Sequence, residues 1–123
     1  MTPTEAEMDI LRILWEEGPS TVRLVNEKLN GIKPTGYTTT LKIMQIMFDK
    51  DLVKRNETNR SHIYTAKIGQ DETQIRLMDR LLDSAFGGSA SKLVMQALGS
   101  HAPSENELIK IKKLISDIEE GRQ

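Results

Sequence analysis

The spacing of apolar residues changes once within residues 1–69, and this change restricts what the chain can fold into. Up to about residue 50 the apolar positions recur every three or four residues, as they do on one face of a helix. Beyond that point the pattern becomes that of two extended segments, 52–57 and 60–66, joined around Thr58–Asn59. We therefore expect helices first and a β-hairpin after them.

Capping and breaking residues divide the helical part into three predicted helices. The first begins at a capping box formed by Thr4 and Glu7, in which each side chain bonds a free backbone N–H at the helix start. A second, short helix follows Ser20 or Thr21, and a third begins near Tyr37. The residues that separate them are Gly18, Pro19, Asn30, Gly31, Pro34 and Gly36.

Each predicted helix carries one apolar face, which we expect to form the core. These core positions are Met8, Leu11, Leu14 and Trp15 in the first helix, Val22, Val25 and Leu29 in the second, and Tyr37, Leu41, Met44, Met47 and Phe48 in the third. Tyr64 and Ala66 share one side of the hairpin. A polar stripe on the third helix stays available to a partner; it consists of Thr38, Lys42, Gln45 and Asp49. Three helices followed by a two-stranded ribbon form the winged variant of the helix-turn-helix, so the predicted fold class is mainly α with a small β part.

Three more helices are predicted in the C-terminal part of the chain. Asp71 is expected to cap a helix over 72–86, and a short helix follows over 89–98. After a break at 99–103, a second capping box that begins with Ser104 starts the last helix.

We expect two domains, a winged-helix DNA-binding domain of residues 1–69 and a helical dimerisation domain of residues 70–123. A set of helices of about 50 residues has a thin core by itself, which a second copy of the chain would cover. Such a last helix can instead bind a different protein, but a two-fold dimer matches a palindromic DNA site, which favours self-association. The residues expected at the dimer interface are Leu77, Leu81, Leu82, Phe86, Leu93, Val94, Ala97, Leu108, Ile111, Ile115 and Ile118.

The net charge of −1 conceals an uneven distribution of charge along the chain. Residues 20–69 contain nine basic and four acidic residues, whereas residues 1–19 and 70–123 both carry a net negative charge. A basic run taken alone is more often a solvated surface. A basic excess that coincides with a predicted winged helix is typical of a DNA-binding surface.

The start of the third helix is the candidate DNA-reading surface. Thr38, Thr39 and Lys42 can present hydroxyls, methyl groups and an ammonium to the major groove, and free N–H groups at the helix start can meet a phosphate. The basic hairpin residues, Lys54 among them, would contact the flanking backbone or the minor groove. Each feature has a structural alternative, since threonines begin helices and charged hairpins protect sheet edges. The predicted DNA contacts are Thr21, Arg23, Lys33, Tyr37, Thr38, Thr39, Lys42, Gln45, Arg55, Arg60 and His62.

The sequence gives no support for a catalytic, metal or cofactor site. The chain has no cysteine, which excludes disulfides and thiolate ligands and permits a reducing compartment. His62 and His101 lack metal-ligand spacing, and Gly87–Ser89 lacks the lysine and the strand of a nucleotide loop. With no signal sequence and no apolar run long enough to span a bilayer, we expect a cytoplasmic protein without membrane insertion and without enzymatic activity.

Several segments in a fixed order carry a resemblance to a known family. The segments are Thr4–Trp15, Thr21–Val25, Gly36–Lys42 and His62–Tyr64, followed by Leu81–Asp83 and Phe86–Ser89. In these positions, and over nearly its whole length, the chain resembles the penicillinase-repressor family, which includes the methicillin-resistance and copper-transport repressors. The resemblance implies a homodimeric winged-helix repressor on an inverted repeat with TACA-like and TGTA-like half-sites, controlling β-lactamase, antibiotic-response or metal-response genes.

The chain also departs from the family pattern in ways that bear on its regulation. In the better-known members a membrane sensor-protease system triggers cleavage between an Asn and a Phe in the fifth helix, where this sequence has Gln96–Ala97. The C-terminal cysteine cluster of the copper-responsive members is absent, and Ile46 stands where many relatives have an Arg. The alternative function is a winged-helix module that binds proteins and not DNA.

Overall fold

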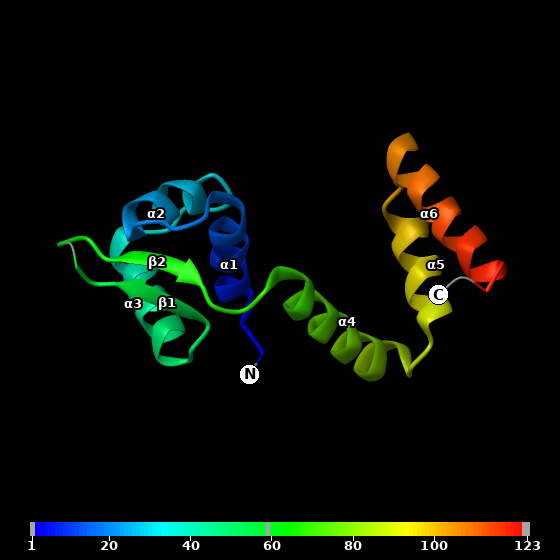
Figure 1. The fold of residues 1–123 in the computed structure, drawn as a ribbon, viewed down its shortest axis with the longest axis horizontal. Helices are drawn as coiled ribbons and strands as arrows, with labels where there is room; N and C mark the ends of the chain where they lie inside the picture. Colours follow the sequence, from blue (N-terminus) through cyan, green and yellow to red (C-terminus); the bar gives the residue numbers. More distant parts are fainter. Residues whose placement is uncertain (1, 59, 122–123) are drawn as a thin grey trace. The chain divides into compact units, whose positions relative to one another are not determined.

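The chain forms two compact units, residues 1–78 and 79–123, in a computed structural model that describes residues 2–58 and 60–121 (Figure 1). Unit 1 contains α1 (Glu5–Glu17), α2 (Val22–Asn30), α3 (Tyr37–Asp49), β1 (Val53–Asn56), β2 (Ile63–Ala66) and the first part of α4 (Gln70–Phe86). Unit 2 contains the end of α4, α5 (Ala90–Ser100) and α6 (Glu105–Glu119). The predicted fold class, a mainly α winged helix with a C-terminal helical region, is confirmed. Of the predicted hairpin turn, Asn59 lies outside the described residues.

The core of unit 1 is built from one face of each helix and from the hairpin. The buried apolar residues are Ile10, Leu11, Ile13, Leu14, Val22, Val25, Leu29, Met44, Met47, Leu52, Val53 and Tyr64. The predicted face of α2 is therefore confirmed, while α1 also buries Ile10 and Ile13, which the three- and four-residue spacing omitted. Tyr37 was expected in the core but is 50% exposed. It is the first residue of α3, and helical side chains lean toward the N-terminus, so its ring extends past the end of the core.

The hairpin is fastened to the start of α2 by a short additional pairing. The two strands are antiparallel, with Arg55 opposite Tyr64. On its other edge, Tyr64 exchanges both backbone hydrogen bonds with Ser20, at 2.8 and 2.9 Å. Ser20 directly precedes Thr21, whose side chain caps α2 by accepting from the Leu24 N–H at 3.2 Å. The wing is thus held next to the N-terminus of α2.

The turn between α2 and α3 is fixed by amide side chains. Asn26 Nδ2 donates to the Thr35 carbonyl at 2.9 Å and to Thr40 Oγ1 at 2.8 Å. Asn30 accepts from the Thr35 N–H at 3.0 Å and donates back to the Thr35 carbonyl at 2.9 Å. Thr40 is fully buried and donates to the Gly36 carbonyl at 3.2 Å. These bonds satisfy the polar groups of the turn and set the angle at which α3 leaves α2.

Glu7 joins the start of α1 to the end of α3. Its Oε1 accepts from the Thr4 N–H at 2.9 Å, which completes the predicted capping box, and its Oε2 accepts from Lys50 Nζ at 2.8 Å. Lys50 is the C-cap of α3, where the helix dipole favours a cation. Burial raises the pKa of Glu7, but the hydrogen bonds from Lys50 and Thr4 outweigh burial and hold this pKa below its ordinary value.

We expect Glu7→Gln to lower the free energy of unfolding by about 1–3 kcal/mol near pH 6, because the buried site loses a charge-assisted hydrogen bond. The folded-state pKa of Glu7 is depressed, so its contribution is present above the ordinary pKa and disappears as the pH falls through the folded pKa. The difference between the native chain and the variant should therefore shrink toward pH 3. Urea unfolding followed by circular dichroism at several pH values measures it. Glu16→Gln, at an exposed position of α1, is the control, and a difference that does not change with pH would contradict the assignment.

The first turns of α4 belong to unit 1, and the residue Ile68 just before this helix is attached to α1. Trp15 Nε1 donates to the Ile68 carbonyl at 3.0 Å, and Thr73, which is buried, donates to the Gly69 carbonyl at 2.6 Å. Asp71 was expected to cap this helix, but the helix begins one residue earlier, at Gln70, and Asp71 lies in its first turn. A carboxylate in the first turn still interacts favourably with the helix dipole.

The apolar side chains of unit 2 are exposed or half-buried in the single chain. Ser89 caps α5, and Ser104 with Glu107 forms the predicted capping box of α6. The helix α5 continues through Gly99 to Ser100, two residues beyond its predicted end. No described residue of α5 or α6 is buried. Across the described ranges, none of the helices combines the length and the hydropathy that crossing a bilayer requires.

Candidate nucleic-acid interface

The exposed face of α3 carries most of the side chains predicted to read DNA. Thr38, Thr39, Lys42 and Gln45 are all exposed. The N-cap of the helix is Gly36, which has no side chain, so the first N–H groups of α3 are not bonded by a capping side chain. Such N–H groups favour a negatively charged partner. This face combines hydroxyls, an amide, an ammonium and a helix N-terminus.

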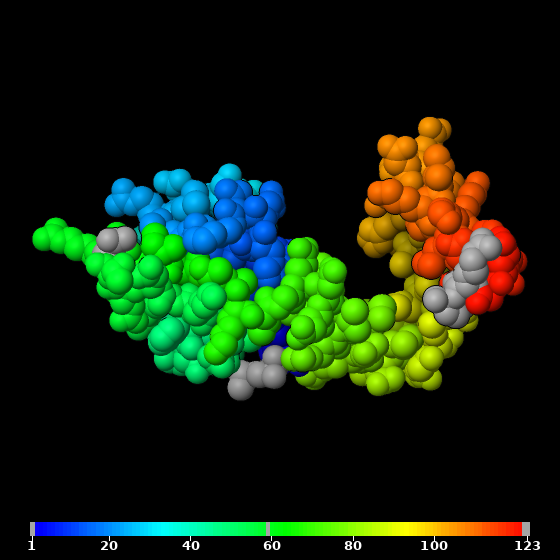
Figure 2. Space-filling model, in the orientation of Figure 1, coloured from blue at the N-terminus to red at the C-terminus, as the bar shows by residue number. Residues whose placement is uncertain are grey.

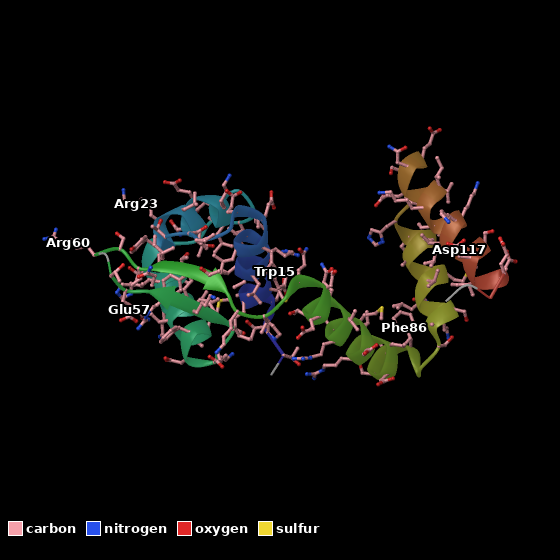
Figure 3. All side chains as sticks on the ribbon, in the orientation of Figure 1. Trp15, Arg23, Glu57, Arg60, Phe86 and Asp117 are labelled. Carbon is pink, nitrogen blue, oxygen red and sulfur yellow. The ribbon has the colours of Figure 1, made fainter. Side chains whose placement is uncertain are left out.

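A cleft of about 400 Å³ lies between the start of α2, α3 and the tip of the hairpin. Six of the predicted DNA contacts line it, namely Thr21, Arg23, Tyr37, Gln45, Arg60 and His62. Leu41 and Tyr64 contribute apolar surface to its wall. The hairpin tip projects from unit 1 in the space-filling view (Figure 2), and the side chains of Arg23 and Arg60 extend outward at that end (Figure 3). Two cations from distant parts of the sequence therefore flank one cleft.

Two predicted contacts lie on the other side of α3. Thr39 and Lys33 line a second, smaller cavity of about 290 Å³, together with Gly36 and Ile43. Thr38 and Lys42 line neither cavity and lie on the exposed surface of the helix between them. The predicted set is thus spread across the width of α3, with Lys42 near its middle at 100° per residue.

Arg55 differs from the other predicted contacts because its guanidinium is engaged by neighbouring side chains. Its Cζ lies 3.9 Å from the centroid of the Phe48 ring, and its Nε donates to Glu57 at 2.5 Å. Hydrogen bonds with Glu57 and Tyr64 raise the pKa of Arg55, and the bond from Arg55 lowers the pKa of Glu57. This arginine therefore ties β1 to the end of α3.

Ion pairs sort the nine basic residues of segment 20–69 into two groups. Four are paired with carboxylates, Lys28 with Glu17 at 3.6 Å, Lys50 with Glu7 at 2.8 Å, Arg55 with Glu57 at 2.5 Å and Lys67 with Asp51 at 2.7 Å. The other five form no ion pair with any described residue, and they are Arg23, Lys33, Lys42, Lys54 and Arg60. These five lie at the start of α2, in the turn before α3, on the exposed face of α3 and on the hairpin. Of these five, Arg23 and Arg60 line the cleft, and Lys42 lies on the exposed face of α3 beside it.

Sequence reasoning missed residues that set the position of this interface. Asn26, Asn30 and Ser20 hold the turn and the wing, and Thr40, which is not among the predicted DNA contacts, was not identified as a core residue. The spacing of Thr40, Met44 and Met47, at three- and four-residue steps, contains the signal that Thr40 belongs to the core. The Ser20 pairing has no local signal, because its partner lies 44 residues away in the chain.

The two histidines belong to different units of the fold. His62 is half-buried in the cleft, and His101 is exposed as the C-cap of α5. Among residues 2–58 and 60–121, no three His, Cys, Asp or Glu side chains gather where they could hold a metal ion.

Comparison with known proteins relates the chain to penicillinase repressors. The family model described as penicillinase repressor matches residues 3–117. The chain is similar to a penicillinase repressor of Staphylococcus aureus, with 19% identity over 113 residues that cover 92% of this chain and 90% of the relative. It is also similar to the transcriptional regulator BlaI of Mycobacterium tuberculosis, with 27% identity over 119 residues that cover 95% of this chain and 85% of the relative.

Proposed function

Because the chain belongs to the penicillinase repressor family, which is a family of transcriptional repressors, we propose that it represses transcription as a homodimer bound to a two-fold symmetric operator. The observation that carries the proposal is the location of three unpaired cations, with Arg23 and Arg60 lining the cleft and Lys42 on the exposed face of α3. Cations already neutralised by carboxylates contribute little to DNA affinity, whereas unpaired ones displace counterions from the phosphates.

Each element has a distinct part in this interaction. The exposed face of α3 enters the major groove, where Thr38, Lys42 and Gln45 reach base edges. The cleft that Arg23 and Arg60 flank lies over the adjoining backbone, and contacts there position the protein without reading sequence. Arg55 holds the wing to α3 and is excluded from the proposed contacts. The proposed operator is an inverted repeat of TACA-like and TGTA-like half-sites at β-lactamase, antibiotic-response or metal-response genes.

The apolar surface of α4 to α6 supports dimerisation. Of the predicted interface residues, Leu81, Val94, Ala97, Leu108, Ile115 and Ile118 are exposed, and Leu77, Leu82, Phe86, Leu93 and Ile111 are half-buried. A surface with this many exposed large apolar side chains marks an interaction site. Pairing with a second copy would cover it and would place two reading helices on one DNA duplex.

The Asn–Phe bond that is cleaved in the better-known members is replaced in this chain by Gln96–Ala97. Gln96 and Ala97, which stand at the place of the cleaved Asn–Phe bond, are exposed residues inside α5. A membrane sensor-protease partner and an intracellular location remain part of the proposal through the family resemblance alone.

A binding selection tests the proposed function. The purified full chain is mixed with duplexes of random sequence at modest ionic strength, and the enriched duplexes are footprinted at base resolution. We expect two protected half-sites related by two-fold symmetry, with centres about one helical turn apart. If no sequence is enriched and no duplex is retained, the chain is not an operator-binding repressor, and the protein-interaction module becomes the better explanation.

A further inference from the structure

We propose that Ile46 recognises the 5-methyl group of a thymine in the operator and so helps to determine which sequence is bound. This inference rests on the proposed function and deepens it. It arises from an exposed apolar side chain on an otherwise polar helix face. Ile46 is 40% exposed, although the buried residues of α3 are close to it in sequence.

The position of Ile46 places it on the reading face of α3. At 100° per residue, Ile46 lies one turn after Lys42 and two turns after Thr39, and both of those side chains are exposed. Ile43 and Met47, which lie toward the core side, are half-buried and buried. A ligand that covers Lys42 and Thr39 along the helix would therefore also cover Ile46.

The chemistry of the major groove limits what Ile46 can contact there. A branched hydrocarbon side chain cannot donate a hydrogen bond to a base edge or form an ion pair with a phosphate. The apolar feature that base pairs display in the major groove is the C5-methyl group of thymine. A methyl group pressed against Ile46 would remove apolar surface of both partners from water, which is favourable in proportion to the area covered.

The charges around Ile46 favour a contact with a base edge over one with the backbone. Lys50, one turn further along α3, is paired with Glu7 at 2.8 Å, so this end of the helix has lost one cation. Asp49 is exposed next to it and repels phosphates. The unpaired Arg23 and Arg60 are left to hold the DNA backbone, while Ile46 contributes sequence discrimination.

The test replaces thymine by deoxyuridine, which lacks only the methyl group. In the operator obtained by selection, each thymine of the half-sites is changed singly, and binding is measured for the native chain and for Ile46→Ala. At one thymine position per half-site we expect the native chain to bind about fourfold more weakly to the deoxyuridine operator, and about fifteenfold more weakly when both half-sites are changed. For Ile46→Ala, the same replacement should make less than a twofold difference.

Two controls isolate the contact. Thymines outside the protected half-sites should tolerate deoxyuridine with either protein. Ile109→Ala removes the same atoms from a 65% exposed isoleucine of α6 and should keep the full methyl dependence of the native chain. If every thymine tolerates deoxyuridine, or if Ile46→Ala shows the same loss as the native chain, Ile46 does not read a methyl group. In both of those cases the native chain still binds its operator, which distinguishes them from a failure of the proposed function.

Discussion

With Leu108→Asp and Ile111→Asp introduced together, the protein is expected to elute as a monomer and to bind its operator about a thousandfold more weakly. Each substitution places a carboxylate on the apolar stripe of α6, and the two-fold axis doubles the number of buried charges to four. Unpaired charges in an apolar interface carry a desolvation cost of several kcal/mol each. Without the second protomer, each unit 1 binds its half-site alone and loses the high effective concentration that linkage provides.

Size-exclusion chromatography and operator titration measure these two effects separately. Ile109→Asp is the matched control, since Ile109 is 65% exposed and lies on the same helix but at least 100° from the stripe formed with Ile115 and Ile118. The control should remain dimeric and keep its operator affinity. A persistent dimer in the double variant would place the interface elsewhere on the chain.

The second large effect is expected from Lys42→Ala combined with Arg60→Ala. Both side chains are exposed and unpaired among the described residues, one in the middle of the α3 face and one at the wing tip. The dimer loses four cations, so operator affinity should fall by about 100-fold to 1000-fold. The slope of log K against log salt should become shallower by about three to four.

The paired lysines supply the matched control for this experiment. Lys28→Ala with Lys67→Ala also removes two cations per protomer from the same charged segment, but both are neutralised by carboxylates, Glu17 and Asp51. This variant should change the salt slope little. An unchanged affinity of the Lys42 and Arg60 double variant for the operator would refute the proposed interface.

Features encoded by neighbouring residues were predicted well from the sequence. Both capping boxes, at Thr4 and at Ser104, form as expected because each involves residues three positions apart. The buried face of α2 follows from helical periodicity in the same way. The prediction that Asp71 caps α4 is wrong by a single residue. Assignments of a helix start commonly differ by one or two residues.

Features that depend on distant residues could not be predicted. Which cations are free depends on carboxylates brought close by folding, and Glu7 meets Lys50 from 43 residues away. The charge of Arg55 is visible in the sequence, whereas its stacking on Phe48 is not. Helical periodicity assigned Tyr37 to the core, but periodicity does not show how far the core extends along the helix. The Tyr37 side chain is 50% exposed.

The hydrogen bond between Trp15 and the Ile68 carbonyl makes tryptophan fluorescence sensitive to the folding of one unit. Trp15 is the single tryptophan of the sequence, and it lies in the winged-helix unit where α4 begins. Intrinsic fluorescence therefore reports on that unit alone, while the far-ultraviolet signal sums over every helix. Two melting curves recorded on one sample would reveal whether the halves of the molecule lose their structure in one cooperative step or in two.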